Sequence, residues 1–262
     1  MNIFRLGEDR LLKKLSFIRE LDNEVSEIDV RFRQGLLPWW EDLLPYVDGL
    51  QNDFTWHVLP PLVLAAYRFA GLNRQIGLAM ANVFKTFHFA NHVYCSVKDE
   101  EEGQIHDQKL QFSILIADYL FGHVLKQLVT ADASHLLCYF SDMMAEINEG
   151  LVWQHKIHIS PQDVLMKTRV PMYMTAFLTA AELAGFDDEK KALYRKLGFN
   201  YGMAMELLQD GRYYAEAEAY YNESRQLFYR LNQNSVASSI PLEKVLTEMY
   251  LYGCDVEKAA VV

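Results

Sequence analysis

An all-α fold, a single bundle of long helices, is predicted by three features of this 262-residue sequence. Apolar residues recur every three or four positions along most of the chain, as they do on the buried face of a helix. The alternation of apolar and polar residues that is typical of strands is almost absent. No stretch rich in Pro, Gly or Ser divides the chain, which favours one domain over residues 1–262.

The strongest helical patterns lie in the middle and the second half of the chain. Residues 110–129 are apolar nearly all round and predict a buried central helix, in which Asp118 would be a hydrogen-bonded structural acid. The residues that follow predict a long helix with one packed face, formed by Leu136, Leu137, Phe140, Met143, Met144, Ile147 and Leu151. A later amphipathic helix would pack through Tyr213, Ala217, Tyr220 and Ser224.

Start and stop signals set several helix ends. Ser160–Pro161 predicts an N-cap followed by proline at the first helical position, and Gly185 predicts a left-handed end. Pro171 falls between them and predicts a kink. The Asp187–Asp188 pair could bind a metal ion, but a cap of the next helix is the favoured interpretation.

Composition excludes some classes of function. The formal net charge is −10 and the isoelectric point is about 5.3, which argues against a nucleic-acid-binding protein that needs a basic surface. Cys95, Cys138 and Cys254 lie far apart and predict reduced, mostly buried thiols in a cytoplasmic protein. No signal peptide, lipidation site or membrane span is predicted, because no apolar run reaches the roughly 18 residues a span requires.

Histidine pairs are the first candidates for a metal site. His155 and His158 could bind zinc, although a solvated helix end is the favoured interpretation. His88 and His92 lie four residues apart on a helix and could bind a metal ion together. Their apolar neighbours favour ordinary buried or interfacial histidines.

Acidic residues give no specific motif by themselves. The run Asp99–Glu102 is typical of a solvated loop. Glu206 and Asp210 share one helix face and, considered alone, would be surface acids. The sequence also lacks a GxSxG elbow, a glycine-rich phosphate loop and an HExxH motif.

Six segments taken in order resemble the trans-type polyprenyl diphosphate synthases. They are HFANHVYCSVKDEEEG, IADYLFGHVL, MAEINEG, DVLMKTRVPMYMTAFLTAAELAG, LGFNYGMAMELLQD and YYNESRQLF. The resemblance runs from about Pro60 to about Leu231 and implies a helical bundle around a deep central cavity, the isoprenoid synthase fold. Members of that family join an allylic diphosphate to isopentenyl diphosphate. Two Asp-Asp-x-x-Asp motifs hold the magnesium ions that neutralise the departing diphosphate.

Both aspartate-rich motifs are degenerate in this sequence. The first falls on Cys95–Asp99 and retains only Asp99, and the second falls on Gln209–Tyr213 and retains only Asp210. Glu206 stands where the family commonly has the glutamine of Phe-Gln. The resemblance therefore implies no catalytic residue and no metal ligand in this chain, and magnesium is expected only if a catalytic partner supplies its site.

The family's cationic diphosphate ligands are replaced as well. Of its first basic motif, only Pro61 survives within WHVLPP, and the segment 102–106 carries no paired arginines. Lys167 and Thr168 match the family's Lys-Thr pair, where Lys167 could contact a phosphate or be a structural ion-pair partner. The vestigial substrate-binding residues are then Asp99, Lys167, Thr168, Glu206 and Asp210.

A retained bundle with degenerate motifs resembles the non-catalytic small subunits of two-component synthases, such as component I of heptaprenyl diphosphate synthases. Such a subunit supports a catalytic partner in a heterodimer or larger assembly and helps to set the length of the isoprenoid chain, typically for a quinone. The expected interface includes Phe87–Tyr94 and Leu110–Leu128. An active prenyltransferase with a degenerate metal site and an isoprenoid-binding homodimer are the alternatives. An isoprenoid diphosphate is a possible ligand in each case.

Overall fold

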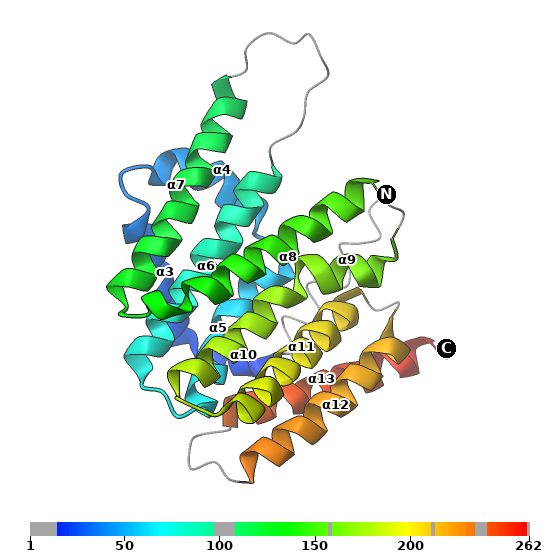
Figure 1. Cartoon of the computed structure of the whole chain (residues 1–262). Coiled ribbons are helices and arrows are strands. Elements are labelled where there is room, and N and C mark those ends of the chain that lie inside the picture. The colour runs from blue at the N-terminus through cyan, green and yellow to red at the C-terminus, as the bar shows by residue number, and fades with distance from the viewer. Residues whose placement is uncertain (1–14, 97–107, 157–158, 211–212, 234–239, 261–262) are drawn as a thin grey trace.

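The chain is helical throughout the ranges described by its computed structural model, which are residues 15–96, 108–156, 159–210, 213–233 and 240–260. No strand occurs within these ranges, so the predicted all-α fold is confirmed. The helices pack side by side as one bundle (Figure 1). Hydrophobic residues of the helices from α2 to α13 share its main core, except those of α4, which pack in a second cluster with residues of α3, α5, α6 and α7.

The helices have the following bounds. The first half contains α2 (Ser16–Glu20), α3 (Asp22–Gly35), α4 (Trp40–Gly49), α5 (Phe54–Phe69) and α6 (Arg74–Cys95). The middle contains α7 (Gln108–Thr130), the short 3-10 helix η1 (Ser134–Leu136) and α8 (Leu137–Lys156). The last part contains α9 (Pro161–Thr168), α10 (Val170–Leu183), α11 (Asp188–Asp210), α12 (Tyr214–Asn232) and α13 (Ile240–Ala260).

Helix α5 forms the centre of the bundle. Almost all of its residues are buried, because it is apolar all round and neighbouring helices cover it. Asp53 begins the helix as its N-cap by accepting a hydrogen bond from the backbone N–H of Trp56 at 2.9 Å. The start of the central helix therefore has a carboxylate at a defined place.

Helix α7 differs from the buried central helix that its composition predicts. One face packs on α6, while the other face leaves Leu115 69% exposed and Val129 61% exposed. Asp118 also lies on the exposed side, so the prediction of a structural acid in a dry interior is wrong. By length and composition alone, the stretch Gln111–Thr130 is apolar enough to cross a membrane, contrary to the sequence prediction. Of an 18-residue window within this stretch, 33% is buried against the rest of the chain.

Most predicted helix ends are confirmed. Ser160 caps α9, with Pro161 at the first position, and Gly185 has a φ of +67° at the end of α10. Asp187 caps α11 through the backbone N–H of Lys190 at 2.8 Å. Pro171 produces a break rather than a kink: the chain ends α9, turns at residue 169 and begins α10 with the proline in its first turn. A proline there has no N–H to continue the helical ladder and needs none at a new start.

The predicted packed face of α8 is also confirmed in its main positions. The preceding 3-10 residue Leu136 and the α8 residues Phe140, Met143 and Ile147 are all buried. Ala217 and Ser224 are buried on the predicted face of α12. Cys95 and Cys138 are exposed, so the prediction of mostly buried thiols is wrong for these two cysteines.

Candidate functional site

Six polar side chains meet at one end of α5 and form what we call the polar cluster. They come from the start of α5, from α6, from the α9–α10 junction, from α10 and from α11, and they are Asp53, Thr55, His88, Arg169, Tyr173 and Glu206. All but Asp53 and Arg169 are buried. Glu206, one of the predicted substrate-binding residues, thus belongs to this cluster.

Asp53 is the acceptor at the centre of one half of the cluster. Its Oδ2 lies 2.9 Å from the Nη2 of Arg169, and its Oδ1 lies 3.1 Å from the Nε2 of His88. Burial alone would raise the pKa of Asp53, but the hydrogen bond from His88 and the charge of Arg169 outweigh it. The pKa of this carboxyl therefore lies well below its ordinary value, and Asp53 is an anion paired within the chain.

His88 is neutral in this arrangement. Burial lowers the pKa of its imidazole and outweighs the opposite effect of Asp53. A carboxylate can only accept, so His88 donates from Nε2 and carries no proton on Nδ1. The Nδ1 atom is buried without a hydrogen-bond partner. The favoured prediction of an ordinary buried histidine holds for His88.

Glu206 is the acceptor of the other half of the cluster. Its Oε1 accepts hydrogen bonds from the Thr55 hydroxyl at 2.8 Å and from the Tyr173 hydroxyl at 2.6 Å. Burial raises the pKa of Glu206, and the charge of Arg169 and the two hydroxyl donors only partly oppose this. Glu206 is 4% exposed, so its interpretation as a surface acid is wrong.

Two glycines bring α10 and α11 close enough for the Tyr173–Glu206 bond. A Cβ on Gly198 would lie 2.7 Å from the backbone oxygen of Tyr173, and one on Gly202 would lie 3.0 Å from its Cβ. Gly198, Gly202 and Glu206 are spaced four residues apart and share one face of α11. This Gly-x3-Gly-x3-Glu pattern is the sequence signal that could have placed Glu206 inside the bundle.

The predicted Lys167–Thr168 pair lies beside the cluster with partners of its own. The ammonium of Lys167 is 3.0 Å from Glu149 in α8 and 5.0 Å from the ring centroid of Trp153. Thr168 is buried and donates to the carbonyl oxygen of Val164 at 2.7 Å. Sequence reasoning did not single out Asp53 or Arg169, although Arg169 directly follows the predicted pair.

The other predicted residues are only partly described. Asp99 lies outside the described residues, as do the segment 102–106 and His158. Asp210 ends α11, but its side chain and that of His155 are outside what the structure describes. Their predicted substrate or metal roles stay predictions.

Magnesium, which the resemblance implies for an active synthase, does not fit the described residues. At the described positions of the two aspartate-rich motifs, the chain has the thiol of Cys95, the hydroxyl of Ser96 and the amide of Gln209, whereas magnesium prefers carboxylates. Within the described ranges, no three His, Cys, Asp or Glu side chains lie close enough to hold a metal ion. The nearest carboxylates, Asp53 and Glu206, already accept bonds from their own neighbours.

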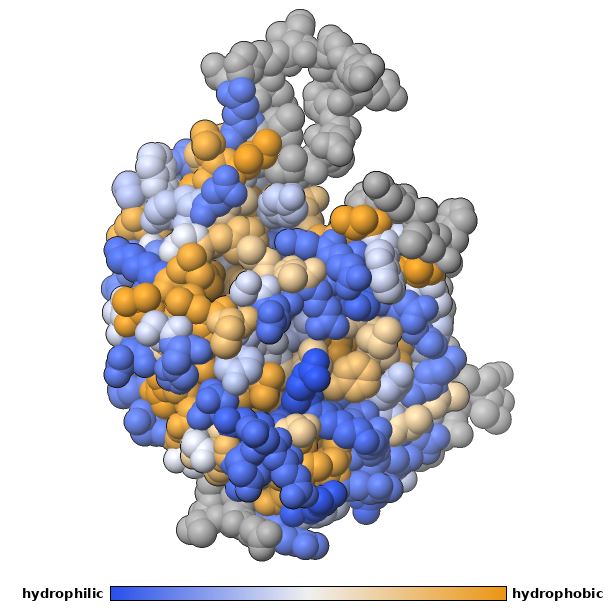
Figure 2. Space-filling view, in the orientation of Figure 1, coloured by the Kyte–Doolittle hydropathy of each residue, from blue (hydrophilic) through white to orange (hydrophobic). Residues whose placement is uncertain are grey.

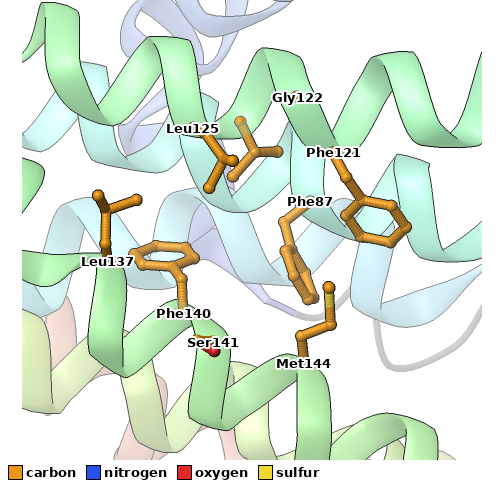
Figure 3. A pocket seen from close by; sticks show the side chains of 9 residues that line it. Phe87, Phe121, Gly122, Leu125, Leu137, Phe140, Ser141 and Met144 are labelled. Carbon is orange, nitrogen blue, oxygen red and sulfur yellow. The ribbon is translucent and has the colours of Figure 1, made fainter.

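An apolar pocket of about 340 Å³ lies between α6, α7 and α8 (Figure 3). The rings of Phe87, Phe121 and Phe140 and the side chain of Met144 surround it, and Leu125 and Leu137 lie along one side. Apart from Ser141, the described residues that line it carry no polar side-chain atom. A pocket of this chemistry suits a hydrocarbon group rather than a diphosphate.

The pocket lies beside an exposed apolar surface that we call the α7 face. Its members are Ile114, Leu115, Tyr119, Leu125 and Val129, each at least 38% exposed. Apolar colour gathers over this part of the molecule in Figure 2. The α7 half of the predicted interface is therefore exposed, whereas Phe87, Phe89 and Ala90 of the other half are buried within the chain itself.

Solved structures share this architecture, although no protein-family model and no curated protein sequence matches the chain. A polyprenyl synthase from Caulobacter crescentus, complexed with calcium and isoprenyl diphosphate, is 16% identical with a TM-score of 0.67, over 92% of this chain and 98% of that one. A mint heterotetrameric geranyl pyrophosphate synthase is 14% identical with a TM-score of 0.65, over 88% and 98%. A geranyl diphosphate synthase small subunit from Antirrhinum majus is 13% identical with a TM-score of 0.64, over 89% and 98%.

These similarities define the class of fold. The chain is an all-α protein with the isoprenoid synthase fold, as the resemblance in its sequence implies. The similar structures include both synthases and a small subunit, and the chain covers nearly the whole length of each.

Proposed function

We propose that this chain is a non-catalytic subunit of a heteromeric polyprenyl diphosphate synthase and that it supports, or sets the length of, the isoprenoid chain made by a catalytic partner. One observation carries the proposal: the charged groups at the end of α5 are paired with each other. Arg169 and Asp53 form an ion pair, and Glu206 accepts from Thr55 and Tyr173. A diphosphate would have to displace these contacts, and Asp53 would repel it.

The α7 face supports the partner in this proposal. Leu115 and Val129 expose most of their apolar surface to water, at a cost that association with another apolar surface would remove. Exposed apolar side chains gathered on one helix are typical of a protein interface, and the charged Asp118 and Lys126 are exposed on the same helix. The geranyl diphosphate synthase small subunit, which has the same fold, is by its description a subunit of a larger enzyme.

The pocket suggests how the chain acts on product length. Leu125 belongs both to the α7 face and to the pocket wall, so a partner docked on α7 would lie against the pocket. Each isoprene unit is apolar and is stabilised when it leaves water. The bulky rings of Phe87, Phe121 and Phe140 would limit how far a growing chain extends on this side.

Product analysis tests the proposal. The purified chain, given an allylic diphosphate, radiolabelled isopentenyl diphosphate and magnesium, should give no prenyl product. Co-expression with an Asp-Asp-x-x-Asp-bearing synthase from the same genome should yield a complex, together with product that is more abundant or longer than that of the synthase alone.

A matched pair of variants links that result to the α7 face. Leu115→Glu in α7 should weaken the affinity for the synthase by about 30-fold or more, so that the two chains no longer co-purify. This corresponds to the loss of about 2 kcal/mol that is typical of a hot-spot residue. Leu251→Glu in α13, which replaces a leucine that is 57% exposed, should leave the complex intact. Equal losses of binding in both variants would show that the α7 face is not the docking surface.

Two other outcomes identify the alternatives. Magnesium-dependent product from the chain alone would establish an active prenyltransferase with an unusual metal site. A homodimer that retains an isoprenoid in native mass spectrometry, and that binds no synthase, would establish a stand-alone isoprenoid-binding protein. The pocket is the feature that favours this second alternative.

A further inference from the structure

Arg169 holds a central place in the polar cluster that its position in the sequence does not reveal. It stands at the junction between α9 and α10, where Pro171 interrupts the helix. Its Nη2 lies 2.9 Å from Asp53, and its charge also acts on Glu206 in α11 and on Cys95 at the end of α6. The arginine therefore faces groups from three helices of the bundle.

The position of these groups matters because one of them falls in, and another just before, the segments that match the magnesium-binding motifs of the family that the chain resembles. Cys95 falls on the first residue of the first motif, and Glu206 falls three residues before the second. In this chain the charge between them is a guanidinium, which stays protonated at every physiological pH. A guanidinium and a divalent cation placed next to the same carboxylate would repel each other.

We propose that Arg169 is a built-in counter-cation, which neutralises the carboxylates at this end of the bundle in place of a metal ion and excludes divalent cations from it. The anionic Asp53 and cationic Arg169 balance, while the neutral His88 and the hydrogen-bonded Glu206 add no uncompensated charge. The chain then folds and docks without magnesium of its own. This extends the proposed function but does not require a partner.

A counter-cation differs from an ordinary stabilising ion pair in what its loss does. Loss of an ordinary pair lowers stability and changes nothing else. Loss of Arg169 should also leave Asp53, which still accepts hydrogen bonds from His88 and Trp56, without its cationic partner near Glu206, and two carboxylates without a nearby cation attract Mn²⁺ or Mg²⁺. Cation-dependent stability should therefore appear in the variant and not in the natural chain.

The experiment measures the melting temperature of the purified chain with and without millimolar MnCl₂, with Mn²⁺ binding followed by electron paramagnetic resonance. The natural chain should show no rise in melting temperature. Arg169→Gln should melt about 5 °C lower or more, and Mn²⁺ should restore a few degrees of that loss. Arg169→Lys keeps the positive charge and should show no Mn²⁺ response.

Controls make the result specific to this arginine. Arg74→Gln removes a charge from the surface ion pair with Glu27 and should show no Mn²⁺ response. Arg169→Gln combined with Asp53→Asn removes both charges and should lose the response of the single variant. If Arg169→Gln does not fold alone, its recovery only in the presence of Mn²⁺ would support the proposal.

Two results would overturn it. One is a Mn²⁺-dependent rise in the melting temperature of the natural chain that equals the rise in Arg169→Gln. The other is Arg169→Gln with no Mn²⁺ response, whether it is stable or recovered as poorly with Mn²⁺ as without. Neither result uses substrate or partner, so the proposed subunit role stands or fails separately in the product assay.

Discussion

The polar cluster and the α7 face differ in where their side chains find partners. In the polar cluster, charged and polar side chains from five parts of the chain bond to each other, with N–O and O–O distances of 2.6–3.1 Å. On the α7 face, large apolar side chains are exposed to water. The polar side chains of the first region have hydrogen-bond and ion-pair partners within the chain, whereas the apolar side chains of the second are not covered by the chain.

The difference indicates which region acts on other molecules. The hydrogen-bonded groups of the cluster are expensive to uncover, because a buried donor or acceptor that loses its partner destabilises the fold. Exposed apolar side chains gain about 25 cal/mol for each Å² that a partner removes from water, which offsets the entropy lost on association. The α7 face is therefore the region to which we assign binding in the proposed function, while the polar cluster stabilises one end of the bundle.

The largest effect on stability is expected at Asp53. Asp53→Ala removes the N-cap of α5, the partner of Arg169 and the acceptor of His88 in one step. We expect the free energy of unfolding to fall by about 3 kcal/mol, because a cap contributes about 1 kcal/mol and the buried His88 and the half-buried Arg169 both lose their acceptor. Chemical denaturation measures this directly.

Asp48→Ala is the matched control for this prediction. Asp48 is an exposed aspartate near the end of α4, so its loss should change the free energy of unfolding by less than about 0.5 kcal/mol. A loss below 1 kcal/mol for Asp53→Ala would show that the polar cluster does not hold the end of α5, and the comparison above would fail.

The next effect is expected at Glu206. Glu206→Leu leaves the buried hydroxyls of Thr55 and Tyr173 without their acceptor and should cost about 2 kcal/mol. Adding Thr55→Val and Tyr173→Phe removes the stranded donors, so the triple variant should be more stable than the single one. Denaturation of both variants tests the order, and a triple variant less stable than Glu206→Leu would contradict it.

Sequence patterns predicted the parts of the fold that depend on near neighbours. The caps at Ser160 and Asp187, the left-handed Gly185 and the buried face of α8 all follow from residues within a few positions of each other. Such features are local consequences of backbone geometry. The isoprenoid synthase fold was reached through the resemblance of six segments rather than through any one helix.

The polar cluster was predicted only in fragments. The resemblance drew attention to Lys167, Thr168 and Glu206, but Asp53 and Arg169 are separated by more than a hundred residues and meet only in the folded bundle. Glu206 was first interpreted as a surface acid because an acid in a helix is usually exposed. Only the spacing of the two glycines before it indicates close packing against α10.

The exposure of α7 could not be predicted from its composition. A helix that is apolar nearly all round is typical of a core, but the same pattern suits a helix with one face on its own chain and the other on a partner. The sequence of one chain does not distinguish these two kinds of burial. The same ambiguity explains why Asp118 was placed in a dry interior.

A smaller effect is expected from the pH dependence of His88. Burial lowers the pKa of His88, so the folded chain resists a proton that the unfolded chain binds below about pH 6.5. The free energy of unfolding should therefore fall as the pH drops from about 6.5 towards the folded pKa, by at most about 1.4 kcal/mol per pH unit. Denaturation curves between about pH 7 and pH 5 measure the slope.

His88→Asn should flatten this slope because asparagine does not titrate there. His135→Asn, at an exposed histidine before α8, should leave it unchanged. The raised pKa of Glu206 acts in the opposite direction, since its stabilising protonation is lost as the pH rises, but all three proteins carry it equally. Identical slopes of the free energy of unfolding against pH for the natural chain and His88→Asn would show that His88 does not cause the pH dependence.

The smallest effect on the isolated chain is expected on the α7 face. Leu115→Glu combined with Val129→Glu replaces two side chains that are mostly exposed, so the free energy of unfolding should change by less than about 0.5 kcal/mol. The same change should make the chain more soluble and, if the proposed function holds, prevent co-purification with the synthase, because two buried carboxylates would oppose association. Denaturation and co-purification should be measured on the same protein. A loss of stability as large as that of Asp53→Ala would mean that the α7 face is packed within its own chain. The contrast between a polar cluster with partners inside the chain and an α7 face exposed to water would then be wrong.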